Sequence, residues 1–83
     1  MTLNQLEELI EDYAPLEREG YNYQKNYDII SCEWWLPLDF PEREIDEIID
    51  DMEDEVGTRI VYRIRETRGD TMVLTFDVSL PAY

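Results

Sequence analysis

The chain of 83 residues contains no histidine, one cysteine and three glycines. Without histidine, a Ser-His-Asp or Cys-His catalytic site cannot be assembled, which removes most hydrolase designs. The lone Cys32 forms no disulfide and no cysteine zinc site within one molecule, so stability must come from packing. Three glycines provide no glycine-rich phosphate loop, and the acidic run at 50–55 lacks the glycine and alternating ligands of a calcium loop. We therefore predict a protein that is not an enzyme and has no cofactor or metal. A carboxylate-based enzyme is a less favoured hypothesis, because paired carboxylates are abundant in the sequence.

Positive charge is scarce, because seven lysines and arginines stand against 21 aspartates and glutamates and give a formal net charge of −14. A field of that sign repels nucleic acids and anionic lipids, so we expect no direct nucleic-acid binding and no membrane attachment. The sequence also lacks an apolar run long enough to span a bilayer, and its start lacks the basic and apolar regions of a secretory signal. These features predict a cytoplasmic protein.

Two segments place apolar side chains at helical spacing, and no linker or repeat divides the chain, which predicts a single domain over residues 1–83. The first predicted helix covers residues 2–13. The second covers residues 41–56, with Pro41 near its first position and Gly57 as its stop. The apolar stripe of the second helix consists of Ile45, Ile48, Ile49, Met52 and Val56.

Three further segments have the composition of β-strands. Residues 27–36 are rich in β-branched and aromatic side chains, while residues 58–66 and 71–80 alternate apolar and polar side chains around a turn at 67–70. An extra edge strand within residues 20–25 is left open. The order α-β-α-β-β predicts an α+β fold, a small two-layer sandwich with two helices on a three- to four-stranded, mostly antiparallel sheet.

If both helices cover one face of this sheet, the opposite face exposes apolar side chains. The predicted exposed strip consists of Ile29, Trp35, Val61 and Val73. Trp34 and Trp35 must point to opposite faces of a strand, so one belongs to the core and the other is available to a partner. Because small monomers seldom leave an apolar strip uncovered, one hypothesis is a structural or assembly subunit that forms a homodimer through this face, with acidity serving only solubility.

The acidity is concentrated in residues 1–57, which carry eighteen acids and three bases, whereas residues 58–83 carry three acids and four arginines. The helix at 41–56 is the densest segment, with Arg43 as its only internal base. Like charges four residues apart cost about 0.2–0.5 kcal/mol per pair, so a sequence selected only for folding would interleave lysines. The candidate partner-binding residues are Glu42, Asp46, Glu47, Asp50, Asp51, Glu53, Asp54 and Glu55, together with Trp35.

Side chains four residues apart on a helix lie about 6 Å apart along its axis, close to the separation of successive phosphates in one DNA strand. The leading hypothesis is therefore a non-enzymatic, nucleic-acid-mimicking inhibitor that occupies the groove of a basic nucleic-acid-binding protein, such as a nuclease or a CRISPR effector. In its composition the chain is similar to phage-encoded anti-CRISPR, anti-restriction and DNA-repair inhibitors and to nuclease immunity proteins. That resemblance implies no residue roles. The alternative is a solvated helix face that only keeps the protein soluble, or an adaptation to high salt.

Uncompensated negative charge predicts that added salt stabilises the fold. The Debye length falls from about 30 Å at 0.01 M to about 8 Å at 0.15 M ionic strength, which screens the mutual repulsion of the carboxylates. We expect the melting temperature to rise across that range. A flat or falling melting temperature would show that internal pairing already removes the repulsion.

Overall fold

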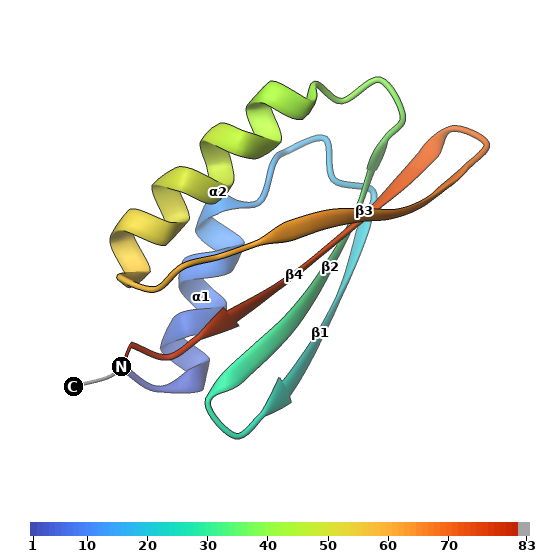
Figure 1. Cartoon of the computed structure of the whole chain (residues 1–83). Helices are drawn as coiled ribbons and strands as arrows, with labels where there is room; N and C mark the ends of the chain where they lie inside the picture. Colours follow the sequence, from blue (N-terminus) through green and yellow to red (C-terminus); the bar gives the residue numbers. More distant parts are fainter. Residues whose placement is uncertain (82–83) are drawn as a thin grey trace.

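Two helices lie on one face of a four-stranded antiparallel sheet in the computed structural model, which describes residues 1–81 (Figure 1). In chain order the elements are α1 (Leu3–Tyr13), β1 (Gly20–Asn26), β2 (Ile29–Pro37), α2 (Glu42–Val56), β3 (Tyr62–Arg68) and β4 (Thr71–Ser79). The strands lie in the order β1-β2-β4-β3. The predicted α+β sandwich is confirmed, and the strand that the sequence left open is the edge strand β1.

Of the helices that the structure describes, none combines the length and the apolar composition needed to cross a membrane.

Both helices begin and end where local chemistry favours it. The Thr2 hydroxyl accepts the Gln5 N–H at 3.2 Å, and the Gln5 side chain accepts the Thr2 N–H at 2.8 Å, which completes a capping box at the start of α1. Helix α2 starts one residue later than predicted, because Pro41 is its N-cap rather than its first helical residue. Gly57 ends α2 with a φ of 83°, a left-handed conformation that glycine adopts without a steric penalty.

Two short hairpins set the strand registers. The first joins β1 to β2 through Tyr27 and Asp28, because Asn26 pairs directly with Ile29. This turn corrects the predicted strand at 27–36, since Tyr27 has a φ of 58° and cannot continue an extended strand. The second hairpin joins β3 to β4 through the two residues 69–70, within the predicted turn.

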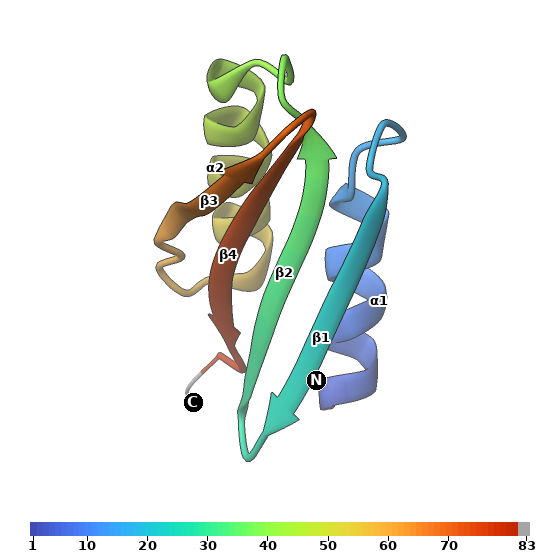
Figure 2. The ribbon, with the colours of Figure 1, turned by 90° about the vertical axis from the view of Figure 1, so that its right-hand side faces the viewer.

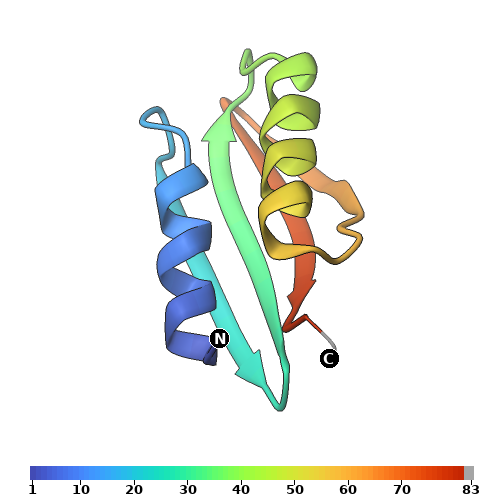
Figure 3. The ribbon, with the colours of Figure 1, turned by 90° about the vertical axis from the view of Figure 1, so that its left-hand side faces the viewer.

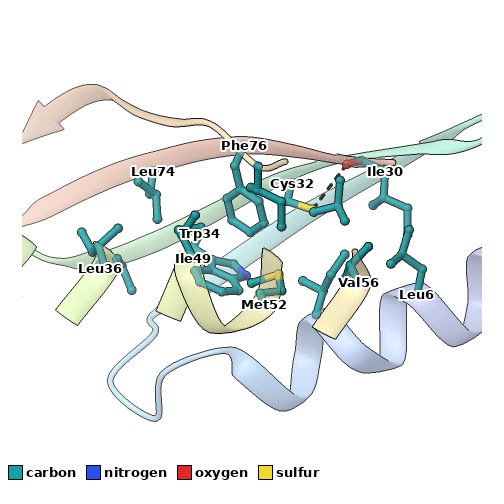
Figure 4. Close-up of a cluster of buried hydrophobic side chains, with 14 of the residues drawn as sticks. Leu6, Ile30, Cys32, Trp34, Leu36, Ile49, Met52, Val56, Leu74 and Phe76 are labelled. Carbon is teal, nitrogen blue, oxygen red and sulfur yellow. Dashed lines mark hydrogen bonds between the residues drawn. The ribbon is translucent and has the colours of Figure 1, made fainter. Parts of the chain in front are cut away.

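The core lies between the helix layer and the sheet (Figure 4). Its fully buried side chains are Leu6, Ile10, Ile30, Trp34, Leu36, Ile45, Met52, Leu74 and Val78. Trp34 packs edge to face against Phe76, with ring centroids 4.8 Å apart. Cys32 lies in the same layer, where burial raises the pKa of its thiol, so this cysteine is a packing residue rather than a nucleophile.

The second sheet face carries no helix, and Figure 2 views the molecule from that side whereas Figure 3 shows the helix side. The predicted apolar strip on this open face is wrong in one respect. Trp35 pairs with Val73 near one end of the sheet, but Val61 precedes β3, whose first pairing residue Tyr62 lies toward the other end. Val61 is 70% exposed and is separated from Trp35 by polar side chains, so the strip is not continuous.

Ile48 and Met52 both belong to the apolar stripe of α2, but they are buried to different depths. Met52 is fully buried, whereas Ile48 is only half-buried at the margin of the core. We expect Met52→Ala to reduce the free energy of unfolding by about 2–5 kcal/mol through lost packing, and Ile48→Ala to reduce it by clearly less. Urea unfolding of both variants measures the difference, and equal losses would contradict this core boundary.

Candidate functional site: the acidic helix layer

Carboxylates surround the part of α2 that does not face the sheet. The apolar stripe takes one side of the helix, and the remaining positions are almost entirely acidic. Seven of the eight predicted acids are exposed, namely Glu42, Asp46, Glu47, Asp50, Asp51, Asp54 and Glu55. Glu53 is half-buried. The structure therefore brings the predicted acids of α2 together on one helix, but not in one environment.

Two of these acids hold α2 to the segment that leads into β3. Glu53 Oε2 accepts the backbone N–H of Ile60 at 2.7 Å. Asp46 Oδ1 accepts the Tyr62 hydroxyl at 2.5 Å, and Glu42 Oε1 lies 3.4 Å from the same hydroxyl. The hydrogen bond to Asp46 is the main reason that the pKa of Tyr62 is raised. Glu53 and Asp46 therefore connect α2 to this segment by hydrogen bonds, in addition to carrying negative charge.

A groove of about 860 Å³ runs along α2 and the segment 57–62, beside these two hydrogen bonds. The buried side chains of Ile49 and Ile60 lie at its base. Asp50 and Asp54 line the helix side, and within residues 1–81 neither makes a hydrogen bond or an ion pair. The groove therefore contains two carboxylates whose hydrogen-bonding capacity is unused.

The opposite flank of α2 faces α1. Burial, followed by the charge of Glu55, raises the pKa of Tyr13 at the end of α1, and Asp51 and Asp54 act in the same direction. These influences place Tyr13 beside the acids of α2, so the two helices form one acidic layer. The nearest base on α2 gives little compensation, because Arg43 lies 3.8 Å from Glu47 in an exposed pair.

The acids of α1 that lie toward β1 form ion pairs with basic side chains. The guanidinium of Arg18 donates to both carboxylate oxygens of Glu11, at 2.8 and 3.0 Å, and this bond is the main reason that the pKa of Glu11 is lowered. Lys25 lies 3.4 Å from Glu7. The exposed acids Glu8 and Asp12 have no such partner among the described residues and extend the acidic layer.

Sequence reasoning did not select Glu8, Asp12 or Glu44 as site residues. The available signal was the spacing of Glu8 and Asp12, which are four residues apart and opposite the apolar stripe of α1. Glu44 carries the same kind of exposed charge in the first turn of α2. We define the acidic layer as the exposed, unpaired acids of the two helices, namely Glu8, Asp12, Glu44, Asp50, Asp51 and Asp54.

Trp35 does not belong to this layer, because it lies on the open face of the sheet. Its indole N–H donates to Glu33 Oε2 at 2.7 Å, and 42% of the residue is exposed. The ring packs so closely on Gly20 of β1 that a Cβ there would come within 2.4 Å of it. The structure thus divides the predicted partner-binding set between two opposite faces.

Across the described range 1–81, no group of three histidine, cysteine, aspartate or glutamate side chains is placed to hold a metal ion. In comparisons with known proteins, no family model, no curated protein and no solved structure gave a significant match to the chain.

Neighbouring acids of α2 are expected to respond differently to removal of the carboxylate. Glu53→Ala leaves the Ile60 N–H without its charged acceptor, so we expect a loss of about 1–2 kcal/mol in the free energy of unfolding. Asp54→Ala removes only a repelling charge, so its stability should be unchanged or higher. Chemical denaturation of the two variants measures these changes. Similar losses at both positions would contradict the distinction between a hydrogen-bonded carboxylate and an unpaired one.

Proposed function

We propose that this protein is a non-enzymatic inhibitor whose acidic layer imitates a nucleic-acid backbone and occupies the binding groove of a basic nucleic-acid-binding protein. The observation that carries the proposal is the absence of cationic partners for Asp50, Asp51 and Asp54 within the described chain. Arg59 lines the same groove as Asp50 and Asp54 but forms no ion pair with either. A nuclease or a CRISPR effector has the chemistry of such a partner, because lysines and arginines line its groove.

The distribution of the bases supports this proposal. Five of the seven bases form ion pairs with acids other than Asp50, Asp51 and Asp54. The two closest pairs join Arg18 to Glu11 and Arg68 to Glu66, away from α2. A protein that needed acidity only for solubility would gain as much from carboxylates in any exposed place. Concentrating them on α2 destabilises that helix. A cationic partner offsets this cost in the complex, because it supplies the charges that α2 lacks.

Spacing is the second support. Asp50 and Asp54 are four residues apart, so their Cα atoms are separated by about 6 Å along the helix axis. This repeat gives a cationic groove a regular series of acceptors. An opposite field of this size also steers a partner before contact, which predicts fast association that weakens with salt.

The direct test uses the triple variant Asp50→Asn, Asp51→Asn and Asp54→Asn. Asp46 and Glu53 are left intact because they are tied to Tyr62 and Ile60. Basic nucleases and CRISPR effectors are assayed for binding of a labelled DNA or RNA duplex in the presence of the wild type or the variant. For a protein that the wild type inhibits, we expect the variant to lose at least about tenfold in competition, equal to about 1.4 kcal/mol, while melting at the same or a higher temperature.

A matched control removes three charges from loops, with Glu17→Gln, Asp28→Asn and Asp39→Asn. These side chains are exposed and make no hydrogen bond or ion pair in the part of the chain described here. The control has the same net charge as the α2 variant, so it should retain competition if position matters. Equal loss in both triples would assign the effect to net charge alone, and unchanged competition by the α2 triple would overturn the proposal.

A further inference from the structure

The open face of the sheet differs from the rest of this acidic molecule because its charges are balanced. Strand register, and for Arg65 the ion pair with Glu33, place three arginines and three acids on that face, namely Arg63, Arg65, Arg68, Glu33, Glu66 and Asp77. Arg65 lies 3.8 Å from Glu33, and Arg68 lies 2.9 Å from Glu66. Strand β1 contributes only uncharged residues to the face. Two copies of a protein with a net charge of −14 can approach here without placing like charges against each other.

The other surfaces of the described chain are poor sites for self-association. The helix layer would bring carboxylates against carboxylates. At the free edge of β1, α1 projects beyond the strand (Figures 2 and 3) and would collide with the same helix of a second copy. The free edge of β3 is interrupted by a bulge between Ile64 and Glu66 and carries arginines, two features that protect edge strands from pairing. The open face is the surface that remains.

This face also carries a partly exposed aromatic ring. Trp35 lies along the face near one end, where its ring packs on Gly20 and its indole N–H donates to Glu33, and 42% of the residue stays exposed beside Val73. A second copy laid over the face covers that exposed part of the ring and leaves both contacts in place. Covered aromatic rings are a common component of protein interfaces.

We propose that two copies of this chain dimerise through their open sheet faces, which covers the exposed part of Trp35 in each copy and places balanced charges against each other. At normal strand spacing and length the face measures roughly 19 by 27 Å, which gives a footprint of about 500 Å² per copy and about 1,000 Å² in total. That area meets the lower limit of a specific interface. Both acidic layers remain on the outside of the dimer.

A charge-exchange series tests this interface. Sedimentation equilibrium is measured at 0.15 and 0.5 M salt, up to about 100 μM protein, a range that covers micromolar dissociation constants. Higher salt screens the overall repulsion, so we expect the wild type to dimerise more tightly at 0.5 M. Glu66→Arg or Arg68→Glu alone unbalances the face and should weaken dimerisation about tenfold, and neither residue bonds to Trp35. The double exchange restores the pair, and its dissociation constant should return to within about threefold of the wild type.

Asp54→Arg is the matched control, because it changes the net charge by the same amount as Glu66→Arg but lies on the far side of the molecule. It should leave dimerisation unchanged or tighten it. Tryptophan quenching by acrylamide gives an independent measurement, since Trp34 is 1% exposed and Trp35 is the accessible indole. Quenching should increase on dilution as Trp35 becomes exposed. A wild type that stays monomeric at both salts, or equal effects of Glu66→Arg and Asp54→Arg, would overturn the proposal.

Discussion

The packing of α2 on the sheet is the interaction on which the remaining structure depends, because that helix carries acids over nearly all of its other surface. Ile45, Ile49, Met52 and Val56 are all buried. Burying one such side chain stabilises the fold by about 1.5–3 kcal/mol, several times the cost of about 0.2–0.5 kcal/mol for one like-charge pair four residues apart. Packing therefore wins, and the helix can hold charges that would unwind it in isolation.

Acids of the same type have different physical roles within this fold. Glu53 and Asp46 each accept a hydrogen bond from the segment that leads into β3, and Glu11 is held by Arg18. Asp50 and Asp54 face solvent and have no partner in the described structure. The first group fixes the shape of the helix layer, while the second group gives it an unsatisfied negative charge. The proposed function rests on the second group, and the first group keeps it in place.

The parts of the fold that follow from periodicity could be predicted from the sequence. The apolar stripe of α2 recurs every three or four residues, and the alternation in β4 identifies its buried face, so both elements were located well. Strand β1 was left open because its composition, GYNYQKN, is mostly polar and lacks a buried alternating pattern. The bulge in β3 gave no signal, since Arg65 and Glu66 are both polar and their order does not show which one is unpaired. The predicted apolar strip failed for a different reason, because Val61 lies outside β3 and toward the opposite end of the sheet from Trp35.

The location of the candidate site was predicted from the sequence, but the different roles of its acids were not. Composition places the acids on α2, yet nothing in the sequence distinguishes Glu53, which binds the Ile60 N–H, from its neighbour Asp54. A weak signal was present, because Glu53 lies next to the apolar stripe, four residues after Ile49. Contacts between distant segments, such as the ring of Trp35 on Gly20, depend on strand register and could not be read from either segment alone.

The central claim is that the unpaired carboxylates of α2 are kept for a cationic partner. Its most direct measurement is the salt dependence of the association constant with an inhibited nucleic-acid-binding protein, taken between 0.05 and 0.3 M salt. If the acidic layer replaces a phosphate backbone, affinity should fall steeply with salt, as it does for nucleic acid on basic proteins. Removing the charges of Asp50, Asp51 and Asp54 should make that dependence shallower. Tight binding that is insensitive to salt in both forms would contradict the account.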